Sequence, residues 1–275
     1  MKARKLAFES GIAPVRCEET AIPMSQPQPD FLPGVPARYV LERLAKADGH
    51  EMSSGKLLSP ESSAALAVNT FGWFHDRPER LPPFAMLGQD ISSPTVVEVE
   101  YRARFPWSGG RHPWLDAWAE TSEAVIGIES KRFEPYRGQK TGFLSPAYDR
   151  QVWHDRMAPF EVMRDRLRSP DEHFNFLDAV QLVKHAFGLV TEGRRKNKRP
   201  YLVYLFAEPP EYAGRPIADG DKRTHRAEIA RFAAAVSGAE VGFEAISYRE
   251  WLATWPDADS ELVHHRAAII ARFQP

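Results

Sequence analysis

The chain lacks several features that would place it outside the ordinary globular proteins. Cys17 is the only cysteine among 275 residues, which excludes an internal disulfide and a zinc site built from several cysteines. No apolar run reaches the roughly 18 residues that a membrane-spanning helix needs. The first residues, MKARKLAFESG, also lack the apolar segment of a secretory signal. We therefore expect a cytoplasmic protein with no membrane partner.

Neither sign of charge dominates the chain. Its 36 lysines and arginines oppose 37 aspartates and glutamates, for a formal net charge of −1. A nucleic-acid contact would therefore have to come from a local patch rather than from the field of the whole protein. The sequence also has no internal repeat, no glycine-rich phosphate loop and no nucleophile elbow. A hydrophobic content of 43% and 27% charged residues are typical of a globular protein.

The first 50 residues differ in composition from the rest. Six prolines fall within residues 11–36, with little hydrophobic periodicity, and they predict an extended arm. A short helix over Ala37–Ala47 follows. We therefore expect an arm with a short helix over residues 1–50 and one domain over residues 51–275, a length that can bury a substantial core.

The remainder alternates between helical and extended patterns. Ser59 as a cap, followed by Pro60, predicts the start of a helix. Alternating apolar and charged residues predict a half-buried strand over Val97–Phe105, and the apolar run Tyr201–Ala207 predicts a strand covered on both faces. Other expected elements are helices over Asp155–Leu167, Asp171–Val190, Lys222–Val236 and Ser260–Phe273, and a strand over Val241–Tyr248. This order predicts an α/β fold in which helices cover both faces of a mixed sheet.

Two further strands, Trp114–Glu120 and Ala124–Lys131, are predicted to form a hairpin in the middle of the chain. Both are rich in aromatic and branched residues, and a short polar connection joins them. If Ser122–Glu123 is the two-residue loop, Asp116 lies opposite Glu129. Directly opposed residues share one face of a sheet, with Cβ atoms about 5 Å apart.

Lys131 and Gly127 complete this expected site. Each is two residues from Glu129, so the alternation of a strand places both on the same face. Gly127 has no side chain and is expected to leave room beside the carboxylates. Asp116, Glu129 and Lys131 would then converge around a gap. This arrangement predicts a metal site with an activating lysine.

The register decides between two interpretations of the hairpin. A slip by one residue would place Asp116 opposite Ile128 and send the two acids to different faces. The predicted register is favoured because Leu115 and Ala117 then share a face with apolar residues, Ile126 and Ile128. In either register, the alternative to a metal site is a solvent-exposed hairpin face with an ordinary cross-strand Glu–Lys pair.

Two other groups are candidate substrate contacts. Gln181 and His185 are four residues apart and lie on one face of the helix predicted over Asp171–Val190. That face is either exposed or directed into a cleft. The segment Arg194–Arg199 is the strongest basic cluster, either a solvated loop or a phosphate clamp close to the site. The clamp would use Arg194, Arg195 and Lys196.

These patterns together resemble the PD-(D/E)XK nuclease superfamily. The resemblance rests on an amphipathic strand, then Asp116, then the segment GIESK at residues 127–131, then a helix and a buried strand. The context GIESKRFEP, SPAY at Ser145–Tyr148 and ESSAALAVNTFG upstream are similar to bacterial restriction-endonuclease-like members. The resemblance covers roughly residues 55–250. Leu115 stands where the pattern has proline, and His185 stands where some relatives have tyrosine in Gln-x-x-x-Tyr.

The resemblance implies a restriction-endonuclease-like three-layer α/β/α fold with a central mixed β-sheet over residues 51–275. It also implies a bound Mg²⁺, with Mn²⁺ as the alternative, held by Asp116, Glu129 and the carbonyl of Ser130. Lys131 would orient the attacking water, with its own pKa lowered near the metal. Gln181 and His185 would bind the substrate backbone or support the site.

The implied function is a Mg²⁺-dependent endonuclease that hydrolyses phosphodiester bonds in DNA, in restriction or defence. RNA is the alternative substrate, and a homodimer is one of the assemblies that the resemblance allows. Two rival functions stay open: a nucleic-acid-binding protein of the same fold that does not cleave, and a structural protein whose acids form ordinary salt bridges. Metal binding by the hairpin would separate the structural protein from both others.

Overall fold

A computed structural model describes residues 30–47, 55–59, 61–88, 91–138 and 142–275. Most of the predicted proline-rich arm, residues 1–29, lies outside the described residues, as does Pro60. Among the described helices, none combines the length and apolarity required to cross a membrane.

A five-stranded sheet forms the centre of the fold, with strand order β1-β2-β3-β4-β7. Its strands are β1 (Val96–Arg102), β2 (Trp114–Glu120), β3 (Ala124–Lys131), β4 (Arg199–Phe206) and β7 (Gly242–Ser247). β1, β2 and β3 pair antiparallel, whereas β3, β4 and β7 pair parallel. The prediction of a mixed sheet is therefore confirmed. A separate small hairpin consists of β5 (Glu211–Tyr212) and β6 (Arg215–Pro216).

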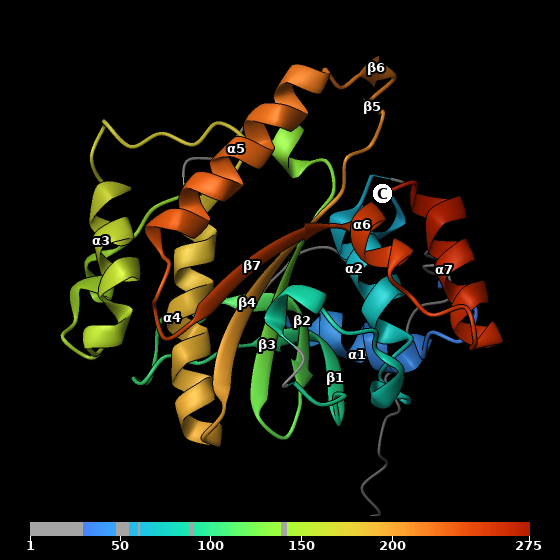
Figure 1. Cartoon of the computed structure of the whole chain (residues 1–275), viewed down its shortest axis with the longest axis horizontal. Helices are drawn as coiled ribbons and strands as arrows, with labels where there is room; N and C mark the ends of the chain where they lie inside the picture. Colours follow the sequence, from blue (N-terminus) through green and yellow to red (C-terminus); the bar gives the residue numbers. More distant parts are fainter. Residues whose placement is uncertain (1–29, 48–54, 60, 89–90, 139–141) are drawn as a thin grey trace, which may run out of the picture.

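Helices cover both faces of the sheet and give three layers (Figure 1). One face carries α1 (Ala37–Lys46), α2 (Ser63–Gly72), α6 (Tyr248–Ala253) and α7 (Ser260–Phe273). The other face carries α3 (Ala158–Arg166), α4 (Ala179–Lys196) and α5 (Asp219–Ala235). Short 3₁₀ helices span Lys56–Leu58, Pro78–Arg80, Ala85–Leu87, Glu134–Tyr136, Pro146–Asp149 and Asp155–Met157. The predicted α/β/α layering is confirmed.

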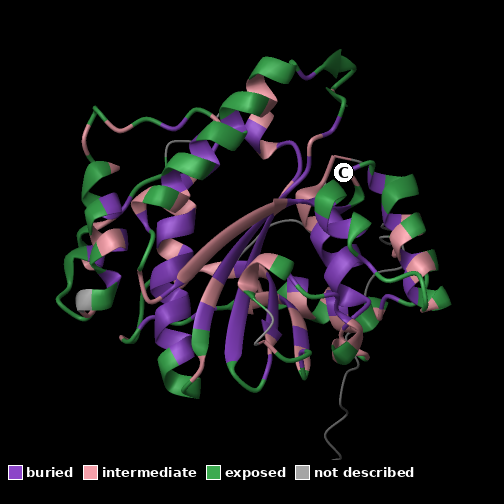
Figure 2. Ribbon diagram, viewed as in Figure 1, coloured by how far each residue is buried: buried purple, intermediate pink, exposed green. Residues whose placement is uncertain are grey.

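The central strands separate two apolar cores, and they are buried along most of their length (Figure 2). Ile126 and Ile128 of β3 pack with α2, α6 and α7, while Val125 packs on the opposite face with α4. Burial on both faces explains why β3 and β4 are nearly continuous apolar runs. Only at its end, at Lys131, does β3 become partly accessible. The chemistry predicted for this chain lies at that end.

The predicted start of α4 was wrong by eight residues. The helix begins at Ala179, and Asp178 is its cap, because the Asp178 carboxylate accepts a hydrogen bond from the Gln181 amide at 2.9 Å. The preceding amides of residues 175–177 donate to the buried carboxylate of Glu228 on α5 instead. This long-range acceptor keeps residues 175–177 out of the helix. α2 likewise starts later than predicted, at Ser63, with Ser62 as the cap.

The helix α1 shares the core of the larger domain. Its Val40 and Leu44 are buried in the same cluster as α2, and Arg43 donates to the carbonyl of Val99 on β1 at 2.9 Å. The predicted boundary at residue 50 stays a prediction.

Two buried histidines make the stability of this fold sensitive to pH. Burial lowers the pKa of His225 and of His265 to about 4. Both are therefore neutral in the folded protein at pH 6, whereas in the unfolded chain they take up protons near pH 6.5. Their contribution to stability is complete above pH 6.5 and is lost as the pH falls toward 4.

We expect the free energy of unfolding to fall by about 2 kcal/mol for each of these histidines when the pH is lowered from 7 to 5. His265 has a matched test, because its Nε2 lies 3.2 Å from the carbonyl of Thr70 and a glutamine amide can donate in its place. Thermal denaturation at both pH values should show a smaller loss in His265→Gln than in the parent. An equal loss in the two proteins would contradict the assignment to His265.

Candidate functional site

The hairpin of β2 and β3 has the register that the sequence predicts. Ala117 pairs with Ile128, and Glu120 pairs with Val125. The regular pairing ends at Ala117 and Ile128, one step before Asp116 and Glu129. The slip by one residue is therefore excluded.

The regular backbone hydrogen bonding between β2 and β3 is interrupted at Asp116. In the regular pattern the amide of Ser130 would bond to the backbone of Leu115, since hydrogen-bonded pairs alternate along an antiparallel hairpin. Instead it donates to Asp116 Oδ2 at 2.7 Å. On β1, Glu100 has a positive φ of 49° and falls between Val99 and Tyr101, which pair with Ala117 and Leu115 of β2. The sheet is thus irregular on both sides of Asp116, as at a β-bulge.

This irregularity corrects two expectations. Leu115 was expected to share a face with Ile126 and Ile128, but it packs in the other core, with α4. Gly127 was expected to leave space, but a Cβ placed on it would lie 2.8 Å from side-chain atoms of both Leu115 and Leu189. The bulge shifts the alternation of β2 by one residue, so the Leu115 side chain lies against Gly127. The open space lies instead beyond the end of β3.

Glu129 lies between a lysine and a histidine in a nearly closed environment. It is 1% exposed, and its Oε1 is 2.5 Å from Lys131 Nζ. Its Oε2 is 3.5 Å from Nδ1 of His185 on α4, and neither of these two atoms has a hydrogen-bond partner among the described residues. A buried carboxylate oxygen without such a partner is costly unless a cation or a donor satisfies it.

The electrostatics of this group are set by burial and by mutual charge. Burial, and after it the charge of Glu129, raises the pKa of Asp116 well above its ordinary value. Burial also raises the pKa of Glu129, against the effect of Lys131. Burial alone would lower the pKa of Lys131, but the charges of Glu129 and Asp116 outweigh it and raise that pKa. The protein's own groups therefore hold the lysine protonated, and the lowered pKa expected for Lys131 beside a metal ion stays a prediction.

Gln181 and His185 stand on α4 as the sequence predicted, at the end of the helix near β3. His185 is buried, and burial together with the charge of Lys131 lowers its pKa to about 3, so it is neutral. Gln181 lies one turn earlier and is partly buried. The structure therefore brings His185 to Glu129, with Gln181 near the helix end that Asp178 caps.

The donor set at this place fits a hard cation. Asp116 and Glu129 offer carboxylate oxygens, and Ser130 offers a carbonyl that points to the same side of β3 as its amide, toward Asp116. The carbonyl of Ser130 has a weak contact with Ser63 Oγ at 3.4 Å. Within the described part of the chain, no three histidine, cysteine, aspartate or glutamate side chains are grouped closely enough to hold a metal alone. Oxygen donors of the kind that Asp116, Glu129 and Ser130 offer fit an ion such as Mg²⁺, which keeps several waters.

Glu134 is a neighbour of this group that sequence reasoning did not place in the site. Its Oε2 accepts hydrogen bonds from Ser63 Oγ at 2.9 Å and from the Arg132 amide at 3.0 Å. Its charge also acts on Asp116 and Lys131. The only sequence signal is an acid three residues after Lys131, in a polar stretch without hydrophobic periodicity.

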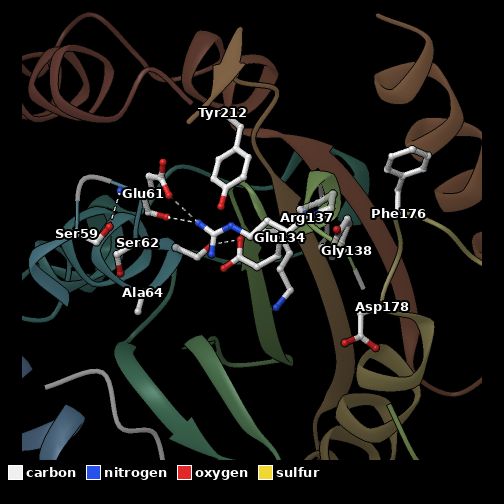
Figure 3. A pocket seen from close by; sticks show the side chains of 14 residues that line it. Ser59, Glu61, Ser62, Ala64, Glu134, Arg137, Gly138, Phe176, Asp178 and Tyr212 are labelled. Carbon is white, nitrogen blue, oxygen red and sulfur yellow. Dashed lines mark hydrogen bonds and ion pairs between the residues drawn. The ribbon is translucent and has the colours of Figure 1, made fainter. Parts of the chain in front are cut away.

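A cavity of about 420 Å³ opens beside Lys131. Its walls come from the start of α2, the segment 134–138, the residues before α4 and the β5–β6 hairpin. Figure 3 shows Glu61, Glu134 and Arg137 on one side of this space, with Phe176 and Asp178 on the other. The cavity gives the end of β3 a route to solvent.

The basic cluster lies at the other end of the fold. α4 begins near Glu129 and is about 27 Å long, so Arg194, Arg195 and Lys196 reach the opposite edge of the sheet. They pair with Glu240 at 3.3 Å, Glu192 at 3.0 Å and Glu120 at 2.7 Å, respectively. The expectation that this cluster lies close to the trio is wrong.

One comparison with known proteins found a matching family. A family model described as "Restriction Endonuclease associating with ARP" (REase-ARP) matches residues 30–272. The matched span includes β1 to β7 and the candidate site residues from Asp116 to Lys196. A search of curated proteins and a search of solved structures each returned no match.

Proposed function

This chain belongs to the REase-ARP family of restriction endonucleases, and we propose that it is a Mg²⁺-dependent endonuclease hydrolysing phosphodiester bonds in DNA. Mn²⁺ is the alternative ion. The single observation that supports the proposal most is the buried Glu129 carboxylate. It is in contact with a protonated lysine, has one oxygen without a hydrogen-bond partner among the described residues, and lies where β2 leaves β3.

Three groups of this chain would hold the ion: the carboxylates of Asp116 and Glu129 and the carbonyl of Ser130. When bound there, Mg²⁺ supplies positive charge beside the scissile phosphate and lowers the pKa of the attacking water. The amide of Ser130 fixes the Asp116 carboxylate at 2.7 Å, so this ligand is oriented before substrate arrives. Preorganised ligands of this kind avoid a reorganisation cost during the reaction.

Lys131 is proposed to act directly on the substrate. Its ammonium group lines the cavity and is held protonated by its acidic neighbours. From there it donates to the attacking water and to a non-bridging phosphate oxygen on which negative charge develops. The surroundings of Lys131 are largely closed to water, and electrostatic stabilisation is stronger in such an environment.

His185 is proposed to position Glu129 rather than to transfer a proton. With a pKa of about 3, the imidazole is neutral near pH 7 and is a poor proton donor. Its Nδ1 faces Glu129 Oε2 at 3.5 Å and limits the orientation of that carboxylate. Gln181, one turn away, is the candidate for contact with the substrate backbone.

Two rival functions fit these observations less well. A purely structural protein gains little from two carboxylates whose pKa values are raised by burial, because buried ionisable groups are costly. A nucleic-acid-binding protein without cleavage would not need Asp116, Glu129 and Lys131 together. A homodimeric assembly and a role in restriction or defence stay predictions.

The proposal is tested by incubating the purified chain with supercoiled plasmid and with linear DNA, in Mg²⁺ and in EDTA. An endonuclease converts the supercoiled plasmid to open-circular and linear forms, and it does so only with the divalent ion. Intact plasmid in both Mg²⁺ and Mn²⁺, or cleavage that persists in EDTA, would overturn the proposal.

A further inference from the structure

We infer that the cavity beside Lys131 binds one unpaired nucleotide of the DNA strand, with Tyr212 stacking on the base and Arg137 holding a phosphate. This inference rests on the proposed function and adds to it the form of the substrate. The strand would be cleaved where a nucleotide is free of its pairing partner, as in a single strand, a bulge or an extruded base.

The size of the cavity sets the first limit. A volume of about 420 Å³ corresponds to a cube about 7.5 Å on a side and lies in the range of small-molecule sites. One nucleotide fits such a space, whereas a stacked base pair does not. Enzymes that act on a nucleotide inside a duplex commonly move it into a closely fitting pocket of this kind.

Tyr212 enters the cavity from a hairpin outside the main sheet. It lies on β5, and Figure 3 shows it pointing from that hairpin toward the space between Glu61 and Arg137. Its ring is partly buried and rests against Phe133 at a centroid distance of 5.2 Å. A ring supported in this way offers the flat apolar surface on which an unpaired base stacks.

The turn of this hairpin is strained. Ala213 has φ of 51° and Gly214 has φ of 72°, which is the positive-φ pair that a tight two-residue hairpin loop requires. Alanine adopts the left-handed conformation less readily than glycine or asparagine does. Strain retained at such a position points to a functional use of the geometry. Here the tight turn fixes the strand that carries Tyr212.

Arg137 supplies the charge for a phosphate. Its guanidinium lies 4.9 Å from the centre of the Tyr212 ring, so both groups line the same wall of the cavity. Its contact with Glu61 is long, at 3.4 Å, and its Nε has no hydrogen-bond partner among the described residues. A guanidinium held this loosely can turn to a phosphate, whose oxygens match its planar fork.

Two of the three acidic side chains that line the cavity have partners other than Arg137. Glu134 accepts two hydrogen bonds, and Asp178 caps α4. Among the described lining residues, Arg137 and Lys131 are the cationic side chains. A phosphate in this cavity would therefore lie between the proposed catalytic lysine and Arg137. The base attached to it would then extend toward Tyr212.

The test measures binding in EDTA, where cleavage is absent, by fluorescence anisotropy. The probes are a fully paired DNA duplex and the same duplex with one extra, unpaired nucleotide in one strand. We expect the parent to bind the bulged duplex more tightly. Tyr212→Ala should lose about 5- to 150-fold in affinity for it, because stacking contributes on the order of 1–3 kcal/mol per base. Tyr212→Phe should retain the affinity.

Arg137→Ala should weaken binding of the bulged duplex and reduce the slope of its salt dependence by about one. Arg231→Ala is the matched control: this guanidinium also stacks on a ring, Phe174, and pairs with an acid, Glu172, but it does not line the cavity. It should bind both probes as the parent does.

Equal affinity of the parent for the two probes would overturn the inference without need of any variant, as would a folded Tyr212→Ala that binds the bulged duplex like the parent. Failure of the proposed function looks different. In that case binding in EDTA depends on Tyr212, but no DNA is cut when Mg²⁺ is added.

Discussion

Replacing Lys131 by methionine is expected to slow Mg²⁺-dependent DNA cleavage by about 10²- to 10⁴-fold, the range observed when one positioned proton donor or charge-stabilising group is removed. Methionine preserves most of the apolar stem and removes the ammonium group. The reason for the loss is local: within the described lining, Lys131 is the cationic group adjacent to Glu129. Single-turnover cleavage of labelled DNA measures the chemical step directly.

The two acids should show losses at least as large, because each is a proposed ligand of the ion. Asp116→Asn and Glu129→Gln keep shape and remove charge. The matched control is the pair of Glu120 and Lys196, which lies 2.7 Å apart at the other end of β2. Glu120→Gln and Lys196→Ala should cleave at nearly the parental rate. Full activity in all three variants of the trio would place the chemistry elsewhere in the chain.

The second large effect concerns stability in EDTA, where Asp116→Asn is expected to melt higher than the parent. Burial and the charge of Glu129 both disfavour an ionised Asp116. An asparagine removes that charge and still accepts the hydrogen bond from the Ser130 amide. We expect a gain of about 1–2 kcal/mol, or roughly 2–8 °C for a protein of this size.

Glu129→Gln should have the opposite effect in EDTA. Glu129 is the direct partner of Lys131, with Oε1 and Nζ 2.5 Å apart. Removing its charge leaves the buried Lys131 ammonium without that carboxylate partner. Breaking a buried ion pair on one side typically costs about 3–5 kcal/mol. Differential scanning fluorimetry of both variants, each compared with the parent, gives the contrast. If Asp116→Asn melts below the parent, the two acids do not destabilise each other and the geometry of the site is wrong.

The hairpin and its register could be predicted from sequence because they depend on local information. A two-residue loop, together with two apolar strands, fixes which residues oppose each other. The pairs Ala117–Ile128 and Glu120–Val125 follow from that count. The bulge at Asp116 could not be predicted, since it depends on a tertiary choice: the Ser130 amide bonds to a side chain instead of the strand. The wrong predictions for Leu115 and Gly127 both follow from this single change of hydrogen-bond acceptor.

The position of the basic cluster could have been inferred from topology. β3 and β4 are parallel neighbours, so the helix between them must return the chain to the edge where β3 begins. Arg194, Arg195 and Lys196 immediately precede β4, and they therefore lie far from the end of β3. The start of α4 is a different case. It depends on Glu228, more than 50 residues later in the chain, and no local pattern around residue 171 shows that contact.

The proposed chemistry depends on whether Asp116 and Glu129 bind a divalent cation at the end of β3. Calorimetric titration of Mg²⁺ into the EDTA-stripped and desalted protein tests this without knowledge of the substrate. The parent should bind Mg²⁺ and melt higher in its presence, because an ion that binds only the folded state stabilises it. Glu120→Gln should respond in the same way, whereas Asp116→Asn should bind little and gain much less. Equal Mg²⁺ binding by the parent and Asp116→Asn, or none by the parent, would contradict the account.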